Sequence, residues 1–346
     1  MGRRVFWGQD IELRAMIRFM DMASTVQLEE LYRPVQGPLD EVCRRLELVW
    51  RDFLRLMNGE SEANARIGGK LLRPALCLLS AGASGAPDLS RFVPMATAME
   101  TFHLGALAHD DVIDGAFMRR GVSSINARWN DHVAVLGGDY LIARGLRFLA
   151  SYSCPPAVAN VVDCLCRMAE GELSDLANGK TRSTLDQCVQ LAQAKTASFF
   201  GMVCSTPAYL VKPAFCDVLR RFGVAVGTAF QLMDDVLDLT QPEETLGKPP
   251  CNDLARHKNT LPILFLRQGL GKTDAARLDS LTGGSLSRAD QIWVAELVAR
   301  TGARERTEDF ARAYISTALQ SLDELPQTAY VDSMRGVAEF VLLRAS

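Results

Sequence analysis

The sequence lacks the features that mark several large classes of protein. Its 38 basic and 41 acidic residues leave a formal net charge of -3, so there is no excess of positive charge for binding nucleic acid. No apolar run is long enough to cross a bilayer, and Asp10, Glu12 and Arg14 interrupt the first apolar residues too early for a secretory signal. We therefore expect a cytoplasmic protein with no integral membrane segment and no nucleic-acid partner.

Cysteine pairs with the spacing of metal sites are also missing. The chain has nine cysteines, an odd number, and none of them stands in a C-x-x-C pair. Cys43, Cys77, Cys204 and Cys216 lie in apolar surroundings along the sequence. The pattern predicts reduced thiols that serve as small core residues, rather than disulfides or a zinc site.

Proline is missing from four long stretches that are rich in alanine and leucine and show helical spacing: 95–154, 157–206, 214–241 and 263–325. Apolar residues recur every three or four positions over 39–57 and 158–177, which indicates one buried face on each helix. No stretch alternates convincingly with a period of two. Because no long linker divides the chain, we predict one all-α domain over 31–346, preceded by an N-terminal extension over 1–30.

One acidic pattern occurs twice in the sequence. Residues 109–114 read His-Asp-Asp-Val-Ile-Asp, and residues 233–238 read Met-Asp-Asp-Val-Leu-Asp. Positions i and i+4 share a face of a helix, so the first and last aspartates of each pattern lie one turn apart. The two clusters consist of Asp110, Asp111, Asp114, Asp234, Asp235 and Asp238.

Carboxylates this close repel one another unless a cation lies between them. Three within about 6 Å would raise one another's pKa, and oxygen ligands of this kind select a hard cation such as Mg²⁺. A solvated helix face is the alternative, but the apolar runs 104–108 and 224–233 precede the clusters and make it costly. We predict that the two clusters face each other and hold a phosphorylated ligand through Mg²⁺.

Basic residues that could bind phosphate directly are spread along the chain. Lys70 and Arg73 lie one helical turn apart, and the others are Arg119, Arg120, Lys195, Lys248 and Lys258. Each alone is more often a surface charge. Together with two acidic clusters they imply two anionic groups, one held by metal and one by direct basic contacts. His103 lies two turns before Asp110 on the same helix face, so we interpret it as a ligand of this site.

These motifs resemble those of the trans-isoprenyl diphosphate synthases, the polyprenyl synthetase family, of the medium- to long-chain type. The resemblance rests on GGKLLRP at 68–74, HLGALAHDDVIDGAFMRRG at 103–121, GGDYLIAR at 137–144, EGEL at 170–173, KTA at 195–197, FQLMDDVLD at 230–238 and GKPPCNDLARHKNTLP at 247–262. It implies an antiparallel all-α helix bundle around a deep central cavity, the isoprenoid synthase fold. It also implies a homodimer with three Mg²⁺ ions in each active site.

The resemblance further implies a role for each matching residue. The direct Mg²⁺ ligands are Asp110, Asp114 and Asp234. Asp111 and Asp238 act directly or through water, and Asp235 completes the second catalytic cluster. The allylic diphosphate contacts Arg119, Lys195 and Lys248, with Lys258 near the metal site. The isopentenyl diphosphate pocket consists of Lys70, Arg73, His103 and Arg120. The catalytic residues Thr196 and Gln231 line the reaction centre, where a carbocation forms.

The reaction implied is the head-to-tail condensation of isopentenyl diphosphate onto an allylic diphosphate, by ionisation followed by alkylation. Mg²⁺ would neutralise the charge that develops on the departing diphosphate, and a dry cavity would protect the allylic cation from water. No side-chain nucleophile is required, which agrees with the lack of a Ser-His-Asp or Cys-His pattern in the sequence.

Product length depends on what blocks the cavity below the first acidic cluster. Gly105 and Ala106 stand one turn before Asp110, where shorter-chain relatives often have an aromatic residue. Phe102, one turn deeper, is the candidate floor, and each turn rises about 5.4 Å, close to one isoprene unit. We predict a product of at least C20. Glu172 and Asp175 form a mixed motif that leaves the product class open, and Ala255-Arg256-His257 differs from the family's usual Arg-Glu-Gly.

Two other functions compete with this interpretation. A class I terpene cyclase also ionises a prenyl diphosphate with Mg²⁺, but it needs no isopentenyl diphosphate pocket. A non-catalytic regulatory subunit of a prenyl synthase would typically have lost one acidic cluster, whereas both are intact here. The residues therefore favour the synthase.

Overall fold

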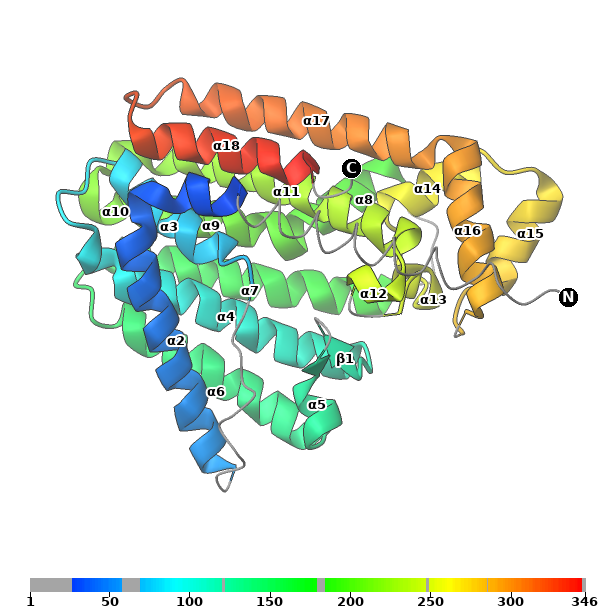
Figure 1. The fold of residues 1–346 in the computed structure, drawn as a ribbon, viewed down its shortest axis with the longest axis horizontal. Helices are drawn as coiled ribbons and strands as arrows, with labels where there is room; N and C mark the ends of the chain where they lie inside the picture. Colours follow the sequence, from blue (N-terminus) through cyan, green and yellow to red (C-terminus); the bar gives the residue numbers. More distant parts are fainter. Residues whose placement is uncertain are drawn as a thin grey trace, which may run out of the picture.

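The computed structural model describes residues 27–57, 69–119, 122–178, 184–246, 249–284 and 286–343. The longer helices are α2 (Gln36–Leu56), α3 (Leu72–Ala83), α4 (Val93–Ile113), α6 (Asp131–Leu149), α7 (Pro155–Asn178), α8 (Leu185–Ala192), α9 (Ser198–Ser205), α11 (Cys216–Thr240), α14 (Leu261–Gln268), α15 (Lys272–Ser280), α16 (Arg288–Thr301), α17 (Ala303–Leu322) and α18 (Ala329–Leu343). The predicted all-α fold is confirmed (Figure 1).

Short elements join these helices. They are the single turns α5 (Ile125–Arg128), α10 (Ala208–Val211), α12 (Glu243–Leu246) and α13 (Asn252–Ala255), the 3-10 turns η1 (Arg33–Val35), η3 (Leu89–Phe92) and η5 (Pro213–Phe215), and the π-helical turn η4 (Gln193–Ala197). The sequence pattern did not predict a hairpin, but β1 (Met118–Arg119) and β2 (Val122–Ser123) form one, with Met118 opposite Ser123. A strand of two residues is too short to show an alternating pattern of apolar and polar residues in the sequence.

The apolar spacing in the sequence accounts for the buried face of α2. Leu39, Val42, Leu46, Val49 and Phe53 are all buried, as their recurrence every three or four positions predicts. The packed part of the chain also begins before the predicted boundary at residue 31. Leu28 is only 3% exposed and belongs to the core, while residues 1–26 lie outside the described ranges.

Helices α4 and α6 run antiparallel in close contact. A Cβ atom on Gly145 of α6 would lie 2.5 Å from the Phe102 ring, and one on Gly138 would lie 2.3 Å from Nε2 of His109. Only glycine permits this approach, so α6 fixes the position of α4, which carries the first acidic cluster at its end.

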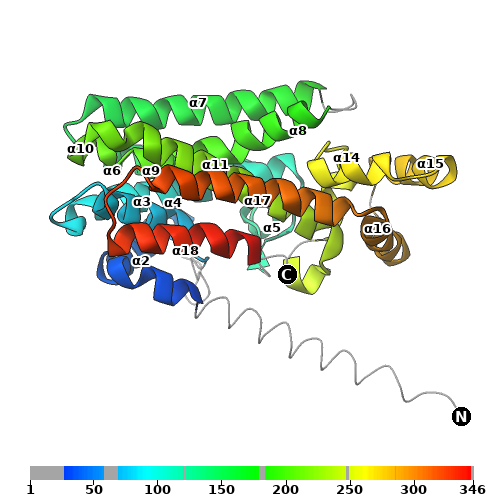
Figure 2. The ribbon, with the colours of Figure 1, turned by 90° about the horizontal axis from the view of Figure 1, so that it is seen from above.

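Helix α11 is held in the same way against α9 and η4. A Cβ atom on Gly223 would lie 2.4 Å from the carbonyl oxygen of Phe200, and one on Gly227 would lie 2.7 Å from the Cα atom of Ala197. Helices α17 and α18 pack on α11 and complete the bundle (Figures 1 and 2). The second acidic cluster therefore lies at the end of a helix that is enclosed by packed neighbours.

All nine cysteines are free thiols. The predicted role as small core residues is confirmed for the six that are buried, whereas Cys43 and Cys154 are partly buried and Cys166 is exposed. Burial raises the pKa of the Cys204 thiol to about 12, so this thiol stays protonated at neutral pH. Among the described residues, no helix combines the length and apolar character needed to cross a membrane.

Candidate active site

The first acidic cluster lies at the C-terminal end of α4. Asp110 and Asp111 belong to its last turn, and Asp114 is the residue that ends the helix. Asp111 is 3% exposed, and its carbonyl oxygen accepts a hydrogen bond from the Asn126 side chain at 3.3 Å. Carbonyl groups at the end of a helix add negative potential to these carboxylates, so this point favours cations.

The second acidic cluster lies at the C-terminal end of α11 and is more deeply buried. Asp235 is 6% exposed and Asp238 is 1% exposed, whereas Asp234 is half-buried. The backbone N–H of Asp253 donates to Oδ2 of Asp238 at 3.0 Å. Burial, together with the neighbouring carboxylates of Asp253, Asp234 and Asp238, raises the pKa of Asp235 well above its ordinary value.

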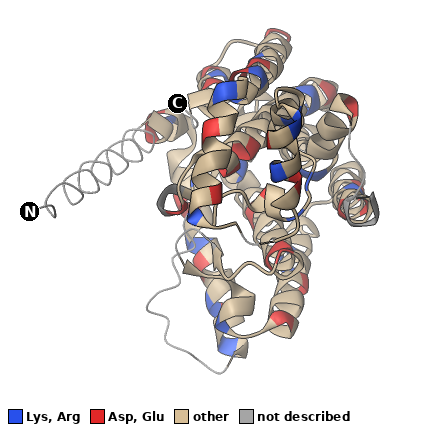
Figure 3. Ribbon diagram, turned by 90° about the vertical axis from the view of Figure 1, so that its right-hand side faces the viewer, with Lys and Arg blue, Asp and Glu red and all other residues tan. Residues whose placement is uncertain are grey.

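One short stretch, Cys251–Lys258, connects the two clusters; we call it the connecting segment. At its start, the backbone N–H of Cys251 donates to the carbonyl oxygen of Asp238 at 2.7 Å. At its end, Nζ of Lys258 lies 3.7 Å from Oδ1 of Asp253 and 3.5 Å from Oδ2 of Asp114. Figure 3 looks onto this end of the molecule, where acidic and basic residues lie on neighbouring helices. The structure therefore links the clusters through Asp253: its N–H binds Asp238 of the second cluster, and its carboxylate and that of Asp114 of the first cluster lie beside one ammonium group.

The charge state of Lys258 reflects the first cluster and the acidic residues beside it. Burial lowers its pKa, but the carboxylates of Asp253, Asp114, Glu172 and Asp110 outweigh burial and raise the pKa above its ordinary value. Lys258 is therefore a permanent cation between the ends of α4 and α11.

Arg256 is a further cation at the first cluster, and the sequence analysis assigned it no role. Its Nη1 lies 3.4 Å from Oδ1 of Asp114 and donates to the carbonyl oxygen of Ile113 at 3.3 Å. Its Nε donates to Oδ1 of Asn252 at 3.1 Å. The only sequence signal was that Arg256 stands where the resemblance gives glutamate.

A chain of hydrogen bonds leads from η4 to the second cluster. The Thr196 hydroxyl donates to Oε1 of Gln231 at 2.5 Å, and Nε2 of Gln231 donates to Oδ1 of Asp235 at 2.8 Å. Lys195, also on η4, forms an ion pair with Glu172 of α7. From this π-helical turn, Thr196 reaches α11 and Lys195 reaches α7, and such turns are frequent at functional sites. The structure thus brings together the predicted Lys195, Thr196 and Gln231.

The residues predicted to bind the second anion begin α3. The Lys70 side chain is exposed, and its backbone carbonyl accepts a hydrogen bond from the buried Tyr32 hydroxyl at 2.9 Å. The Arg73 guanidinium lies 5.0 Å from the centroid of the Phe200 ring, with the rings of Phe199 and Phe230 at 5.7 and 6.0 Å. Aromatic faces attract a guanidinium and hold it in place. His103 lies partly buried on α4.

Some predicted residues cannot be placed. Arg120 and Lys248 lie outside the described residues, and the side chains of Arg119 and Asp175 are not described. Their roles stay predictions.

Two of the residues predicted to control product length, Phe102 and Gly105, lie on the side of α4 that faces α6. The Phe102 ring is 1% exposed and contacts Gly145 of α6, and a Cβ on Gly105 would lie 3.0 Å from the Gly138 carbonyl oxygen. Ala106 is four residues before Asp110 and shares its face. Phe102 therefore lies on the α6 side of the helix, and it can act as a floor only for a chain that runs between α4 and α6.

The donor set fits a hard cation. Carboxylate oxygens from two helix ends converge on the connecting segment, and Mg²⁺ prefers such oxygens together with water and phosphate. Within the described ranges, no three acidic, histidine or cysteine side chains lie close enough together to hold an ion as they stand. At the first cluster, Arg256 and Lys258 lie beside the two carboxylate oxygens of Asp114. A cation binding there must share or displace these contacts.

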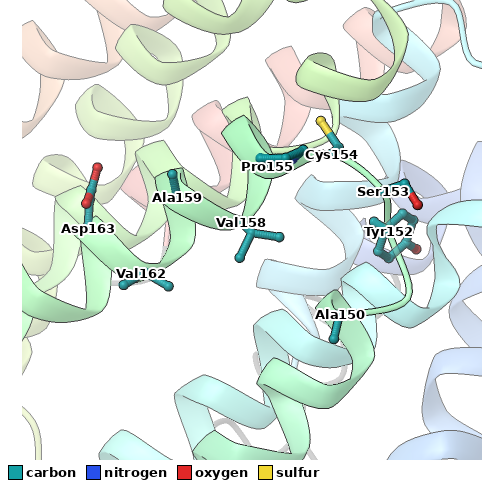
Figure 4. A pocket seen from close by; sticks show the side chains of 9 residues that line it. All are labelled: Ala150, Tyr152, Ser153, Cys154, Pro155, Val158, Ala159, Val162 and Asp163. Atoms are coloured by element: carbon teal, nitrogen blue, oxygen red, sulfur yellow. The ribbon is translucent and has the colours of Figure 1, made fainter.

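A separate hollow lies at the far end of the bundle. It is lined by the end of α6, the connection that follows and the start of α7, including Ala150, Tyr152 and Val158 (Figure 4). The Tyr152 hydroxyl lies 3.2 Å from the backbone nitrogen of Met95, near the start of α4. At a rise of 1.5 Å per residue, Met95 lies about 22 Å along this helix from Asp110. The hollow is mainly apolar and is separate from the charged site.

Comparisons with known proteins agree with this arrangement. Residues 55–297 match the family described as polyprenyl synthetase. An all-trans-nonaprenyl-diphosphate synthase (geranyl-diphosphate specific) from Rhodobacter capsulatus is 36% identical over 80% of this chain and 86% of its own length. A heptaprenyl diphosphate synthase component 2 from Geobacillus stearothermophilus is 32% identical over 96% of this chain and 98% of its own length.

Solved structures share the fold. A polyprenyl synthase from Caulobacter crescentus, crystallised with calcium and isoprenyl diphosphate, has a TM-score of 0.83 and 29% identity over 92% of this chain and 98% of its own. A decaprenyl diphosphate synthase from Rhodobacter capsulatus has a TM-score of 0.78 and 25% identity, covering 92% of this chain and 99% of its own.

Proposed function

This chain belongs to the polyprenyl synthetase family, and from that premise we propose the reaction that it catalyses. It is a trans-prenyltransferase that condenses isopentenyl diphosphate head-to-tail with an allylic diphosphate and gives an all-trans polyprenyl diphosphate of C20 or longer. The observation that carries the proposal is the link between the two acidic helix ends: Asp253 of the connecting segment binds Asp238 at the end of α11, and Lys258 lies beside both Asp253 and Asp114 at the end of α4. A long-chain product is supported by the nonaprenyl and heptaprenyl names of the relatives.

The acidic clusters hold the allylic diphosphate through metal. Asp110, Asp114 and Asp234 would hold three Mg²⁺ ions, which supply positive charge for the diphosphate as it departs. Lys195 and Lys258 add direct contacts to the same group, together with Arg119 and Lys248. The calcium and isoprenyl diphosphate in the Caulobacter crescentus structure support a divalent cation beside this ligand.

The second substrate binds at the start of α3. Arg73, held by three aromatic rings, and Lys70 bind the diphosphate of isopentenyl diphosphate, together with His103 and Arg120. The allylic C–O bond breaks and the electron pair leaves with the diphosphate. The double bond of isopentenyl diphosphate then attacks the allylic carbon, and the released diphosphate accepts the proton that is lost.

Polar groups on η4 and α11 would stabilise the carbon that becomes positive. The Thr196 hydroxyl donates to the Gln231 amide oxygen, so the lone pairs of the hydroxyl oxygen can face the cation. Gln231 in turn donates to Asp235, which fixes its amide group. Oriented dipoles of this kind stabilise charge without reorganising during the reaction.

A homodimer is part of the proposal. Leu136 of α6 is 68% exposed, and Phe117 and Val122 beside the hairpin are 72% and 61% exposed. Large apolar side chains with this exposure are typical of surfaces that another copy covers. Sedimentation analysis of the purified protein should give twice the chain mass.

The test is a product assay with purified protein, Mg²⁺, isopentenyl diphosphate and, in turn, geranyl, farnesyl or geranylgeranyl diphosphate. The expected product is a series of all-trans polyprenyl diphosphates that ends at C20 or beyond and disappears with EDTA. Cyclic hydrocarbon from a long prenyl diphosphate alone would show a terpene cyclase instead. Replacing Phe102 with Ala tests the floor, because unchanged product length would remove Phe102 from that role.

A second candidate is an enzyme that works only with a partner protein. It is favoured by one observation, the designation "component 2" of the Geobacillus stearothermophilus relative. Activity of the purified chain alone would exclude it. An inactive chain that restores the activity of an added partner would establish it.

A further inference from the structure

The connecting segment contains one arginine whose contacts all serve the first acidic cluster. Arg256 reaches Asp114 and Ile113, which lie 142 and 143 positions before it in the sequence, while its Nε donates to Asn252 of α13. Ile113 is the last residue of α4, so its carbonyl is one of those that no helical N–H can satisfy. The guanidinium thus neutralises both the helix end and a carboxylate.

The segment around Arg256 is held in an unusual backbone conformation. Cys251 and His257, at either side of Arg256, adopt positive φ angles of 59° and 58°, which are costly for residues other than glycine. Surrounding contacts hold it there: the N–H of Lys258 donates to the carbonyl of Asp253 at 2.9 Å, and the N–H of Gly283 donates to that of Ala255 at 2.9 Å. The position of Arg256 is therefore fixed by the fold and is not that of a loose surface side chain.

We propose that Arg256 is a positioning residue that occupies Asp114 in the metal-free enzyme, and that a divalent cation must displace it to bind the first cluster. This inference rests on the proposed function, because it takes Asp114 as a metal ligand. Nη1 of Arg256 lies beside Oδ1 of Asp114 and Nζ of Lys258 lies beside Oδ2, so both oxygens face a protein cation. A metal ion approaching either oxygen meets a like charge.

Arg256 therefore lowers the affinity for free metal and stabilises the metal-free fold. Without it, the repulsion toward an incoming cation falls, while the partly buried carboxylates of Asp114 and its neighbours lose a counter-charge. The two effects have opposite signs, which separates this role from a purely structural one. Lys258 still lies beside Asp114 when Arg256 is replaced, so the gain in metal affinity is partial.

The experiment measures Mn²⁺ binding by the full-length protein without any phosphate ligand, by electron paramagnetic resonance of the free ion. Arg256→Gln should bind Mn²⁺ about 3- to 10-fold more tightly than the wild type, the range expected for one partly exposed charge. In EDTA its thermal midpoint should fall. Unchanged or weaker Mn²⁺ binding, or an unchanged midpoint, would overturn the proposal.

Matched variants make the outcome specific. Arg221→Gln on α11, which removes the exposed ion pair of Arg221 with Glu324, should change neither quantity. Arg256→Lys keeps the charge and should bind Mn²⁺ less tightly than Arg256→Gln, and it replaces that variant if the latter does not fold. Asp114→Asn should weaken Mn²⁺ binding; if it does not, the proposed ligand set fails. If Asp114→Asn weakens binding and Arg256→Gln does not strengthen it, only the role of Arg256 fails.

Discussion

The two acidic clusters have the same sequence pattern but different surroundings. At the end of α4, Asp114 is balanced by protein cations, Arg256 and Lys258. At the end of α11, Asp238 is almost fully buried and accepts a backbone N–H, and Asp235 is buried among carboxylates with a raised pKa. The comparison teaches that the fold accommodates one acidic motif in two ways, by fixed positive charges at the first cluster and by burial and hydrogen bonds at the second.

The largest expected effect tests what the clusters share. Asp110→Asn and Asp234→Asn should each lower kcat by about 10³-fold or more, because in the proposed mechanism each of these carboxylates holds metal on the same departing diphosphate. Steady-state kinetics in saturating Mg²⁺ measures this. Asp217→Asn, on the exposed first turn of α11, is the matched control and should retain activity. Loss of activity with only one of the two cluster variants would show that the clusters do not act together.

A smaller effect separates the clusters by pH. An aspartate in an unfolded chain has a pKa of about 3.9, and the pKa of Asp235 in the folded protein lies well above that value. At pH values between these two pKa values, only the folded state holds the proton. Stability of the metal-free protein should therefore fall as pH rises above about 4.5, by up to about 1.4 kcal/mol per pH unit for this group.

Urea unfolding in EDTA between pH 4.5 and 8 measures this dependence. Asp235→Asn should flatten it, because its amide cannot ionise, and should stabilise the metal-free protein at neutral pH. Asp217→Asn should leave the wild-type slope intact. A slope that persists in Asp235→Asn would assign the proton to another group.

The smallest effect concerns the connecting segment. His257 has a φ of 58°, and glycine adopts this conformation without strain, so His257→Gly should stabilise the protein by up to about 1 kcal/mol. His257→Ala keeps the strain and should give no gain. Urea unfolding of both variants checks this. A loss of stability in His257→Gly equal to that in His257→Ala would show that the ring contact with Gly283 outweighs the backbone strain.

Sequence periodicity was enough to predict the helices and the two acidic helix ends. The buried face of α2 follows the apolar spacing, and the i, i+4 rule put the aspartates on common faces. The contact between Arg256 and Asp114 could not be predicted, because it joins residues 142 positions apart through a segment whose backbone depends on tertiary contacts. The π-helical turn at Gln193–Ala197 also leaves no periodic signal.

The orientation of Phe102 also could not be predicted from the sequence. Counting turns places it two turns before Asp110, but which side of α4 it takes depends on Gly145, a residue 43 positions later. The close approach of α4 and α6 depends on glycines of α6, so it cannot be predicted from the sequence of α4 alone.

The central claim is that the two clusters hold one diphosphate through divalent cations. A crystal structure with Mn²⁺ and a non-hydrolysable allylic thiodiphosphate, phased at the manganese absorption edge, tests it most directly. The account predicts manganese peaks beside Asp110 and Asp114 and beside Asp234, all in contact with the same diphosphate. A diphosphate held by one cluster alone, or manganese bound elsewhere, would contradict it.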